Sequence, residues 1–269
     1  IVWNNSSPVF SGGTVNVAYS NIQSGASYTS IGNNKPDGTD PLFINAPIAG
    51  AAPTAAGDFH LTNNSPVIDM GDDAANTYPT DLDGKPRIVR TIDMGAYEFD
   101  GIFCGLFTSG LVYVDSAAIG MNDGSSWTDA FKDLQDALLA LATCQGVDTI
   151  KVAKGTYYPS SPDTTIDVCS GMMMITPANR AESFNILDST VILGGYLVFE
   201  GIALNRDPHC NKTILCGEIQ QDNDNTNNSY HVVTTFDVSD QTVVDGFCIT
   251  GGRADEQTMP HNSGGGWYN

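Results

Sequence analysis

The residues best suited to chemistry in this sequence are the aspartates of one short turn, Asp81 and Asp83, together with Asp93. Carboxylate oxygens are the ligands that Ca²⁺ prefers, and alternate aspartates on a turn can converge on one cation. The spacing is not that of an EF-hand, which needs a glutamate at its twelfth position. We therefore expect a calcium site at these three aspartates. The alternative is a turn closed by ion pairs between these acids and the nearby Arg87 and Arg90.

Other reactive side chains are sparse. Asp58 and His60 alternate along a strand-like run, which predicts that they share a face, but no nucleophile accompanies them. Lys151 and Lys154 flank one predicted strand, where the alternative is solvated charge at a strand edge. Residues 222–228 (DNDNTNN) form a second oxygen-rich loop, with a plain solvated turn as the alternative. The sequence therefore contains no converging catalytic set.

These side chains must be positioned by short strands and tight turns, with one exception. Residues 127–144 predict the single convincing helix, because Phe131, Leu134, Leu138 and Leu141 recur at helical spacing. Its candidate capping residues and first-turn acid are Ser125, Ser126, Thr128 and Asp129. Strands are predicted on either side of it, at 111–115 and 149–153.

A local pattern of an apolar residue, a variable residue and a glycine recurs after this helix. It occurs at 153–155, 193–195, 215–217 and 244–246. The interval from Leu193 to Leu215 is 22 residues, and a polar insertion at 220–229 lengthens the next interval. A repeat of this length is typical of a solenoid, in which each coil pairs in parallel with the previous one. We therefore expect a β-solenoid, with the helix covering its open end.

The composition restricts the possible partners. Acidic residues number 31 against 11 basic ones, which gives a net charge of −20, and hydrophobic residues make up 41% of the chain. Such a surface argues against nucleic acids, which need basic stripes. It also disfavours polyanionic polysaccharides unless a metal ion bridges the charges. No apolar run approaches the ~20 residues of a membrane span, so we expect none.

Six cysteines lie after residue 103, and their even number is compatible with disulfides and an extracellular location. Cys104 and Cys144 flank the predicted helix and are the preferred disulfide candidates, whereas six free thiols are the alternative. No CxxC motif occurs and the histidines are scattered, which argues against a zinc site. A short apolar connector, 100–110, predicts a division into residues 1–103 and 104–269.

Both halves resemble a known family. Residues 111–159 and the later runs NRDP, TILCGEI, NNSYHVV, TVVDGFCITGG and GGGWYN resemble the opening coils of right-handed parallel β-helix proteins. These proteins belong to the pectate-lyase-like superfamily, in its group of bacterial secreted and surface proteins. The runs YSNIQ, DPLFIN, DFHLTNNSPVIDMGD, TDLDGKPR and DMGAYEF resemble the closing coils and terminal module. The order departs from the family, because the closing end comes first and the middle coils are absent.

The resemblance implies an all-β fold, a right-handed parallel β-helix with one capping helix. Residues 1–103 would be the closing coils of one β-helix and residues 104–269 the cap and first coils of a second. It also implies an extracellular or cell-surface location. It does not imply an enzyme, because many members have no known activity, although lyases on this fold use a basic residue beside bound Ca²⁺.

These observations favour a structural or adhesive extracellular protein, a module of a surface fibre or a large adhesin. The alternative is a polysaccharide-active or carbohydrate-binding protein on the same fold. The chain begins inside a predicted strand, so we expect a processed chain or a segment of a longer one. The expected partners are copies of the chain stacked head-to-tail, or other surface proteins. The expected assembly ends are Ile1, Val2 and Trp3 at the start, and Gly266, Trp267, Tyr268 and Asn269 at the finish.

Overall fold

The computed structural model describes residues 1–3, 5, 10, 13–48, 56–159, 163–166, 173–176 and 179–269. The chain divides into two compact units, residues 1–105 and 106–269. Strands form most of the regular structure, and α1 (Leu134–Thr143) is the single α-helix in the described part of the chain. The expectation of an all-β chain with one helix is therefore confirmed. Within the same residues, no helix has the length and hydropathy needed to cross a bilayer.

Among its described residues, unit 1 contains four short strands and long stretches of turns. They are β1 (Asn16–Ala18), β2 (Thr29–Gly32), β3 (Phe43–Asn45) and β4 (Asp58–Leu61), followed by the 3-10 helix η2 (Asp73–Ala75). The pair β1–β2 is parallel, whereas β3–β4 is antiparallel. Leu61, Val67, Ile68 and Met94 form the buried core. The start of the chain, which the sequence predicts to lie in a strand, contributes only a bridge from Val2 to Ile22.

Unit 2 contains thirteen of the strands, along with the helix. Its strands are β5 (Leu111–Val114), β6 (Thr149–Ala153), β7 (Gly155–Tyr157), β8 (Asp163–Ile166), β9 (Met173–Thr176), β10 (Phe184–Ile186), β11 (Val191–Phe199), β12 (Ile202–Arg206), β13 (Thr213–Cys216), β14 (Val233–Thr235), β15 (Val243–Asp245), β16 (Phe247–Thr250) and β17 (Trp267–Tyr268). Two further 3-10 helices are η3 (Cys104–Leu106), which begins in unit 1, and η4 (Asn225–Asn227). The strand predicted at 149–153 is confirmed to the residue.

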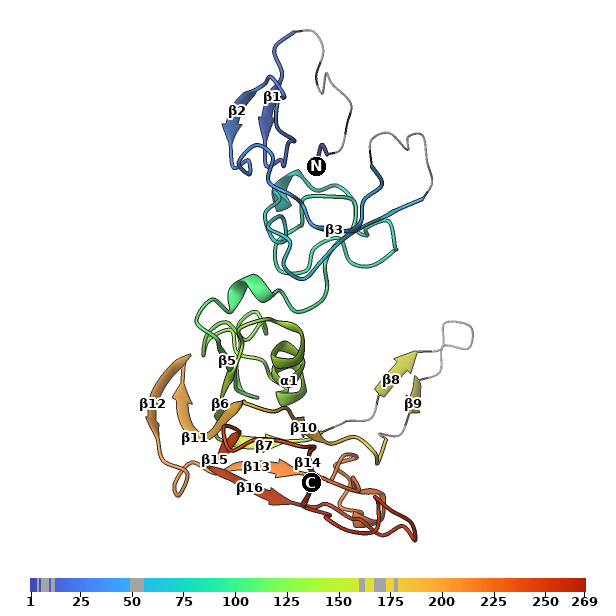
Figure 1. Cartoon of the computed structure of the whole chain (residues 1–269), viewed down its shortest axis with the longest axis vertical. Helices are drawn as coiled ribbons and strands as arrows, with labels where there is room; N and C mark the ends of the chain where they lie inside the picture. The colour runs from blue at the N-terminus through green and yellow to red at the C-terminus, as the bar shows by residue number, and fades with distance from the viewer. Residues whose placement is uncertain are drawn as a thin grey trace. The chain divides into compact units, whose positions relative to one another are not determined.

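Three parallel arrays of strands organise unit 2 (Figure 1). The first sheet contains β5, β6, β11 and β15, the second contains β7, β13 and β16, and the third contains β10, β14 and β17. Along the chain, the strands enter the first, second and third sheet in turn: β6-β7-β10, then β11-β13-β14, then β15-β16-β17. Each pass therefore lays its strands beside those of the previous pass.

The strand register stacks apolar side chains between passes. Ile150 lies opposite Ile192 in the first sheet, and Tyr157 lies opposite Leu215 in the second. All four side chains are buried, as expected for parallel strands covered on their inner face. These aligned residues form the core of unit 2.

Glycine is required where the first sheet meets the second. Gly246 alone connects β15 to β16, with φ +87°, and it lies against Gly194 of the preceding pass. A Cβ added to Gly194 would lie 2.7 Å from the carbonyl oxygen of Gly246, and the reverse distance is 2.6 Å. Successive passes thus approach through bare backbone at this corner, which explains the recurring glycine of the sequence pattern.

The helix begins later than the sequence predicts. Its N-cap is Asp133, whose side chain accepts a hydrogen bond from the N–H of Gln135 at 2.9 Å. The expected caps lie in a preceding turn, where the hydroxyl of Ser126 donates to Asp129 at 2.9 Å. The prediction of a helix across 127–144 is therefore wrong for its first turns, because Ser126 and Asp129 bond with each other and leave the cap to Asp133.

The buried face of α1 consists of Leu134, Ala137, Leu138 and Ala140. The helix contacts β5, β6 and β10, of which β5 and β10 are the first strands of two sheets. Phe131 does not join this face as predicted, because it is buried in a bridge to Val114 of β5. The apolar side chains that the sequence places on a single stripe are thus divided between a helix and a bridge.

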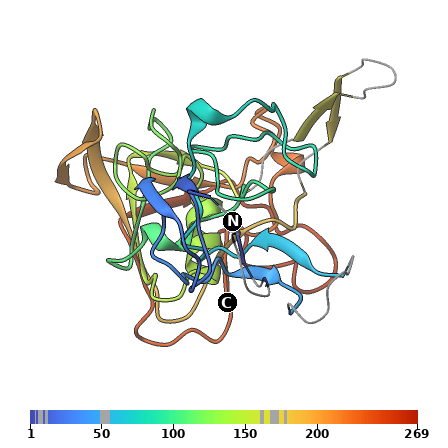
Figure 2. The same ribbon diagram turned by 90° about the horizontal axis from the view of Figure 1, so that it is seen from above.

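One long excursion leaves the first sheet. The second half of β11 continues into β12 as an antiparallel hairpin, with Phe199 opposite Ile202. Both views show this orange ribbon extending outward from the sheet (Figure 1 and Figure 2). All residues of β12 are exposed. A second antiparallel pair is formed by β8 and β9.

Candidate functional site

Asp81, the first predicted calcium ligand, accepts backbone hydrogen bonds on both carboxylate oxygens. Its Oδ1 accepts the N–H groups of Asp83 at 2.9 Å and Lys85 at 3.0 Å. Its Oδ2 accepts the N–H of Glu98 at 3.1 Å. The side chain therefore closes its own turn and ties that turn to the end of the unit.

Asp83, the second predicted ligand, is bonded to a histidine. Its Oδ2 lies 2.7 Å from Nε2 of His60, and Oδ1 of Asp58 lies 2.5 Å from Nδ1 of the same ring. The ring of Tyr97 stacks on His60 with 3.9 Å between centroids. Hydrogen bonds to Asp83 and then to Asp58 raise the pKa of His60, because both stabilise the imidazolium. The sequence predicts that Asp58 and His60 share a face, and in the structure they are in contact.

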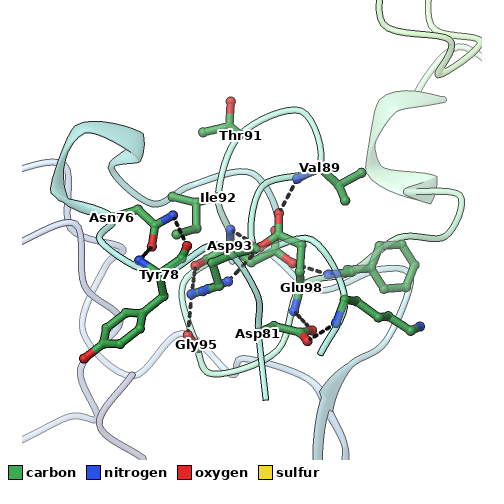
Figure 3. Close-up of polar contacts among 12 residues, drawn as sticks. Asn76, Tyr78, Asp81, Val89, Thr91, Ile92, Asp93, Gly95 and Glu98 are labelled. Atoms are coloured by element: carbon green, nitrogen blue, oxygen red, sulfur yellow. Dashed lines mark hydrogen bonds and ion pairs between the residues drawn. The ribbon is translucent and has the colours of Figure 1, made fainter. Parts of the chain in front are cut away.

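Asp93, the third predicted ligand, forms a buried pair with Glu98 (Figure 3). Asp93 accepts the N–H groups of Asp69 and Phe99, each at 2.7 Å. Glu98 accepts the N–H groups of Val89 at 2.9 Å and Asp93 at 3.1 Å. Burial raises the pKa of Asp93 to about 6 and the pKa of Glu98 to about 7.

The two arginines of the turn are paired, but with other acids than the sequence predicts. Arg87 forms an ion pair with Glu98 at 2.7 Å, and these side chains are only 13% and 1% exposed. Arg87 also donates to the carbonyl oxygen of Gly95 at 2.7 Å. Arg90 pairs with Asp69 at 2.9 Å. The alternative of an ion-paired segment thus describes this region, with Glu98 and Asp69 as the acids.

The geometry of these carboxylates does not fit a calcium site. Asp81, Asp83 and Asp93 are each directed to different partners, and their oxygens accept hydrogen bonds. Within the residues that the structure describes, no three His, Cys, Asp or Glu side chains are grouped so as to hold a metal ion. Calcium binding by this chain stays a prediction; in the structure Asp81 and Asp93 accept backbone amides, and Asp83 bonds the imidazole of His60.

A cavity of about 650 Å³ lies beside this network in unit 1. Its lining includes Tyr19, Asn76, Tyr78, Arg87 and Met94. The side chain of Asn76 is bonded to the backbone of Tyr78, at 2.8 Å through its amide nitrogen and 3.1 Å through its oxygen. Arg87 is held by Glu98, as described above. The side chains of Asn76 and Arg87 are therefore committed to internal bonds.

Unit 2 carries a different candidate surface, the aromatic cluster, which consists of Tyr113, Trp127 and Tyr196. The ring centroids of Tyr113 and Trp127 are 4.9 Å apart, and those of Trp127 and Tyr196 are 5.3 Å apart. A cation lies near each end of the cluster: Lys151 is 5.9 Å from the ring of Tyr113, and Arg206 is 5.8 Å from the ring of Tyr196. Half-buried aromatic rings with flanking cations can stack on the apolar faces of sugars and bond their hydroxyl groups.

A second cavity, of about 480 Å³, adjoins this cluster. Trp127 lines it together with Ile119, Val198 and Phe199, and Asp115 and Glu200 supply its carboxylates. Ile119 is 91% exposed and Phe199 is 64% exposed. The cavity is thus mainly apolar with two acids, which suits a neutral ligand better than a polyanion.

No family model, curated protein or solved structure matches this chain. Its function is therefore inferred from the geometry of its own residues.

The lysines considered for lyase chemistry lie in unit 2. Lys151 is in β6, beside the aromatic cluster, and Lys154 is exposed in the turn that precedes β7. The predicted calcium aspartates belong to unit 1. The structure therefore brings Lys151 to the aromatic cluster of unit 2.

The cysteines are of two kinds. Cys104 and Cys144 are both disulfide-bonded, so the expectation that the chain contains disulfide-bonded cysteines is confirmed. Cys210, Cys216 and Cys248 are free thiols. The sixth cysteine, Cys169, lies outside the described residues.

The predicted assembly ends are parts of strands or bridges. Val2, between Ile1 and Trp3, pairs with Ile22, and Trp267–Tyr268 is β17, which pairs with β14. Asn269 accepts a hydrogen bond from the hydroxyl of Thr235 at 3.0 Å. Contacts with another copy of the chain stay a prediction.

Sequence reasoning missed the buried acid Glu98 and the aromatic cluster. Glu98 could have been predicted as a buried and paired acid, because it stands between apolar residues in AYEF. Tyr113, Trp127 and Tyr196 come from three separate segments, so no local sequence pattern could have brought them together.

Proposed function

We propose that this chain is part of an extracellular right-handed parallel β-helix protein with a structural or adhesive role. The observation that supports this best is the cyclic order of unit 2, in which successive passes of the chain enter three parallel sheets in the same sequence. This order supports a solenoid, in which each coil stacks on the previous one. The helix α1 contacts β5 and β10, the first strands of two sheets, where a cap would lie.

An extracellular or cell-surface location is supported by two features. Cys104 and Cys144 are disulfide-bonded, and disulfides persist mainly in oxidising compartments. The net charge of −20 suits a soluble surface that remains apart from nucleic acids. A scaffold of this kind displays loops and hairpins, such as β11–β12, without a catalytic set.

Self-association by added coils is part of this proposal. The strands β15, β16 and β17 of the third pass each pair on one edge, with β11, β13 and β14. A further coil, from a second copy, would add to their other edges through backbone hydrogen bonds. Sedimentation of the purified chain at increasing concentration tests this idea, and electron microscopy tests for filaments. A monomer at all concentrations would oppose the filament role and leave an adhesive role to test.

The second candidate function is the binding of a neutral polysaccharide at the aromatic cluster. It is favoured by the rings of Tyr113, Trp127 and Tyr196, by the flanking cations and by the adjoining cavity. A panel of immobilised polysaccharides, with wild type, Trp127→Ala and Trp267→Ala, tests it. Trp267 lies in β17 of the third sheet and is a matched aromatic control. Binding lost only in Trp127→Ala would support this function.

The same panel distinguishes binding from catalysis. Polysaccharides are incubated with the chain, and new reducing ends or ultraviolet absorbance from unsaturated products is measured. Product formation that depends on Lys151 would overturn the structural proposal in favour of a lyase. Binding without products would place the chain among adhesive or carbohydrate-binding proteins.

A further inference from the structure

Two histidines of unit 2 face each other away from the surfaces described so far. Nε2 of His231 lies 3.2 Å from Nδ1 of His261, and Nδ1 of His231 lies 3.1 Å from the carbonyl oxygen of Gly264. His231 precedes β14 and is only 4% exposed. His261 belongs to the connection between β16 and β17, residues 251–266. The pair therefore joins this connection to the preceding pass of the chain.

The hydrogen bonds fix the positions of the protons in the neutral pair. A carbonyl oxygen only accepts, so Nδ1 of His231 carries a proton and donates it to Gly264. A neutral His231 then has a bare Nε2, which accepts from the N–H at Nδ1 of His261. The fourth nitrogen, Nε2 of His261, is bare in this arrangement.

Polar and ionisable groups hold the middle of the connection. None of the residues 253–264 is buried. Besides the histidine pair, Arg180 bonds Asp255 at 2.7 Å, and the hydroxyl of Tyr230 bonds Glu256. Because no buried apolar side chain anchors this segment, its attachment depends on the protonation of these groups.

We propose that His231 and His261 form a proton-operated latch. The latch holds the connection 251–266 against the preceding pass when the pair carries no added proton or one, and it releases the connection when the pair carries two. The first proton binds Nε2 of His261 and leaves both hydrogen bonds of the pair intact. The resulting imidazolium stacks on the ring of Tyr230, with 4.3 Å between centroids, and a cation on an aromatic face is stabilised there. The latch is therefore closed through this first step.

The second proton has one remaining position, Nε2 of His231, which is the acceptor of the bond between the rings. Its protonation converts that acceptor into a donor, so two N–H groups face each other and the bond breaks. Two imidazolium rings with centroids 5.3 Å apart also repel each other in a poorly solvated site. The second step therefore opens the latch.

The neighbouring charges influence when this second step occurs. The guanidinium of Arg180 lies 4.1 Å from the ring of Tyr230 and disfavours a second cation. Asp255 is already paired with Arg180 and with Arg253, at 2.7 Å and 2.6 Å, so its charge is compensated. Glu256 bonds the hydroxyl of Tyr230, and the ring of Tyr268 covers His231 with 4.8 Å between centroids. Opening is thus expected at a lower pH than the first protonation step.

Hydrogen exchange of residues 254–263 at about pH 7.5 and about pH 4.5, corrected for intrinsic rates, tests the latch. EDTA is present throughout, so that the response is to protons alone. We expect at least about tenfold faster exchange at the acid pH, as for the loss of one hydrogen bond to a charged group. In His261→Phe, which retains a ring against Tyr230, exchange should be fast at both pH values. His209→Phe replaces an exposed histidine outside this pair and should keep the acid response.

An independent readout follows the imidazole signals of the wild-type chain by nuclear magnetic resonance. We expect two separated steps, with His261 titrating first and His231 at a lower pH. Simultaneous titration of both rings in a single step would overturn the latch. Exchange that is unchanged between the two pH values would also overturn it, as would an acid response retained in His261→Phe.

Discussion

The N–H of Asp93 donates to Oε2 of Glu98 at 3.1 Å, so one backbone amide joins two buried carboxyl groups of unit 1. Around them, the backbone of residues 62–100 forms no strand, and carboxylates accept the N–H groups that a sheet would otherwise bond. This unit is therefore held by acids whose protonation affects its stability.

The first prediction concerns the pH dependence of unit 1. The pKa values of Asp93 and Glu98 are raised to about 6 and about 7 from ordinary values of 3.8 and 4.5. A carboxyl group with a raised pKa stabilises the folded state fully at pH values below its ordinary pKa. This stabilisation is lost as the pH rises through the folded-state pKa. The free energy of unfolding of unit 1 should therefore fall between about pH 4 and about pH 7.

Urea unfolding at a series of pH values measures this change in the free energy of unfolding. Hydrogen exchange of residues 61–98 is used to monitor unit 1. Glu98→Gln should flatten the upper part of the pH dependence, whereas Glu182→Gln, an exposed residue of unit 2, should leave it unchanged. A stability that rises over this range would contradict the prediction.

The second prediction concerns the glycine corner of unit 2. Gly246 has φ +87° and a Cβ there would meet the carbonyl oxygen of Gly194, whereas Gly146 has φ +88° with nothing within 4 Å. Gly146→Ala should therefore cost about 1–2 kcal/mol from backbone strain alone. Gly246→Ala should cost at least about 2 kcal/mol more, because the backbone of the preceding pass must move. Equal midpoints of urea unfolding for the two variants would refute close packing at this corner.

The third prediction concerns His60, which two aspartates contact. Because the pKa of His60 is raised, the hydrogen bonds of its ring to Asp58 and Asp83 stabilise the fold fully below about pH 6.5. This stabilisation is lost as the pH rises through the folded-state pKa of His60. Titration of the ring by nuclear magnetic resonance should give a midpoint above the ordinary value. Asp83→Asn should lower this midpoint, and Asp100→Asn, which removes the partner of Lys85, should not.

The fourth prediction concerns the packing of α1. Leu138 is 7% exposed and Leu139 is 52% exposed, although they are neighbours on one helix. Leu138→Asp should lower the free energy of unfolding of unit 2 by about 3 kcal/mol or more, because it removes core contacts and buries a carboxylate. Leu139→Asp should change it by no more than about 1 kcal/mol. Similar thermal unfolding midpoints for the two variants would show that α1 does not pack as described.

Local patterns in the sequence predicted the elements whose residues bury side chains at regular spacing. The alternation in TIKVA placed β6 correctly, and Leu134 and Leu138 marked the helix. The start of the helix was predicted too early, since Ser126 and Asp129 satisfy each other and Asp133 caps the helix. Competition between equivalent caps depends on where the chain turns, which spacing does not determine.

The sites were harder to predict than the strands. Asp81, Asp83 and Asp93 look like metal ligands because of their type and spacing, but each carboxylate bonds a nearby N–H or imidazole. Which donor reaches a carboxylate depends on contacts such as Asp81 with Glu98, distant in the sequence. The pairing of His231 with His261 likewise depends on the stacking of one pass on another.

The corner between the first and second sheets also has a consequence for how this chain can change over generations. Thr213 lies opposite Gly155 and Phe247, although the whole β11–β12 hairpin precedes it and Gly246 alone precedes Phe247. The register of the second sheet is thus independent of the length of the connection from the first sheet. Duplications and deletions in the gene can therefore accumulate in the hairpin while the neighbouring strands keep their alignment. The same position would accept a foreign peptide, and surface variety in this molecule can arise by changes of length as readily as by substitution.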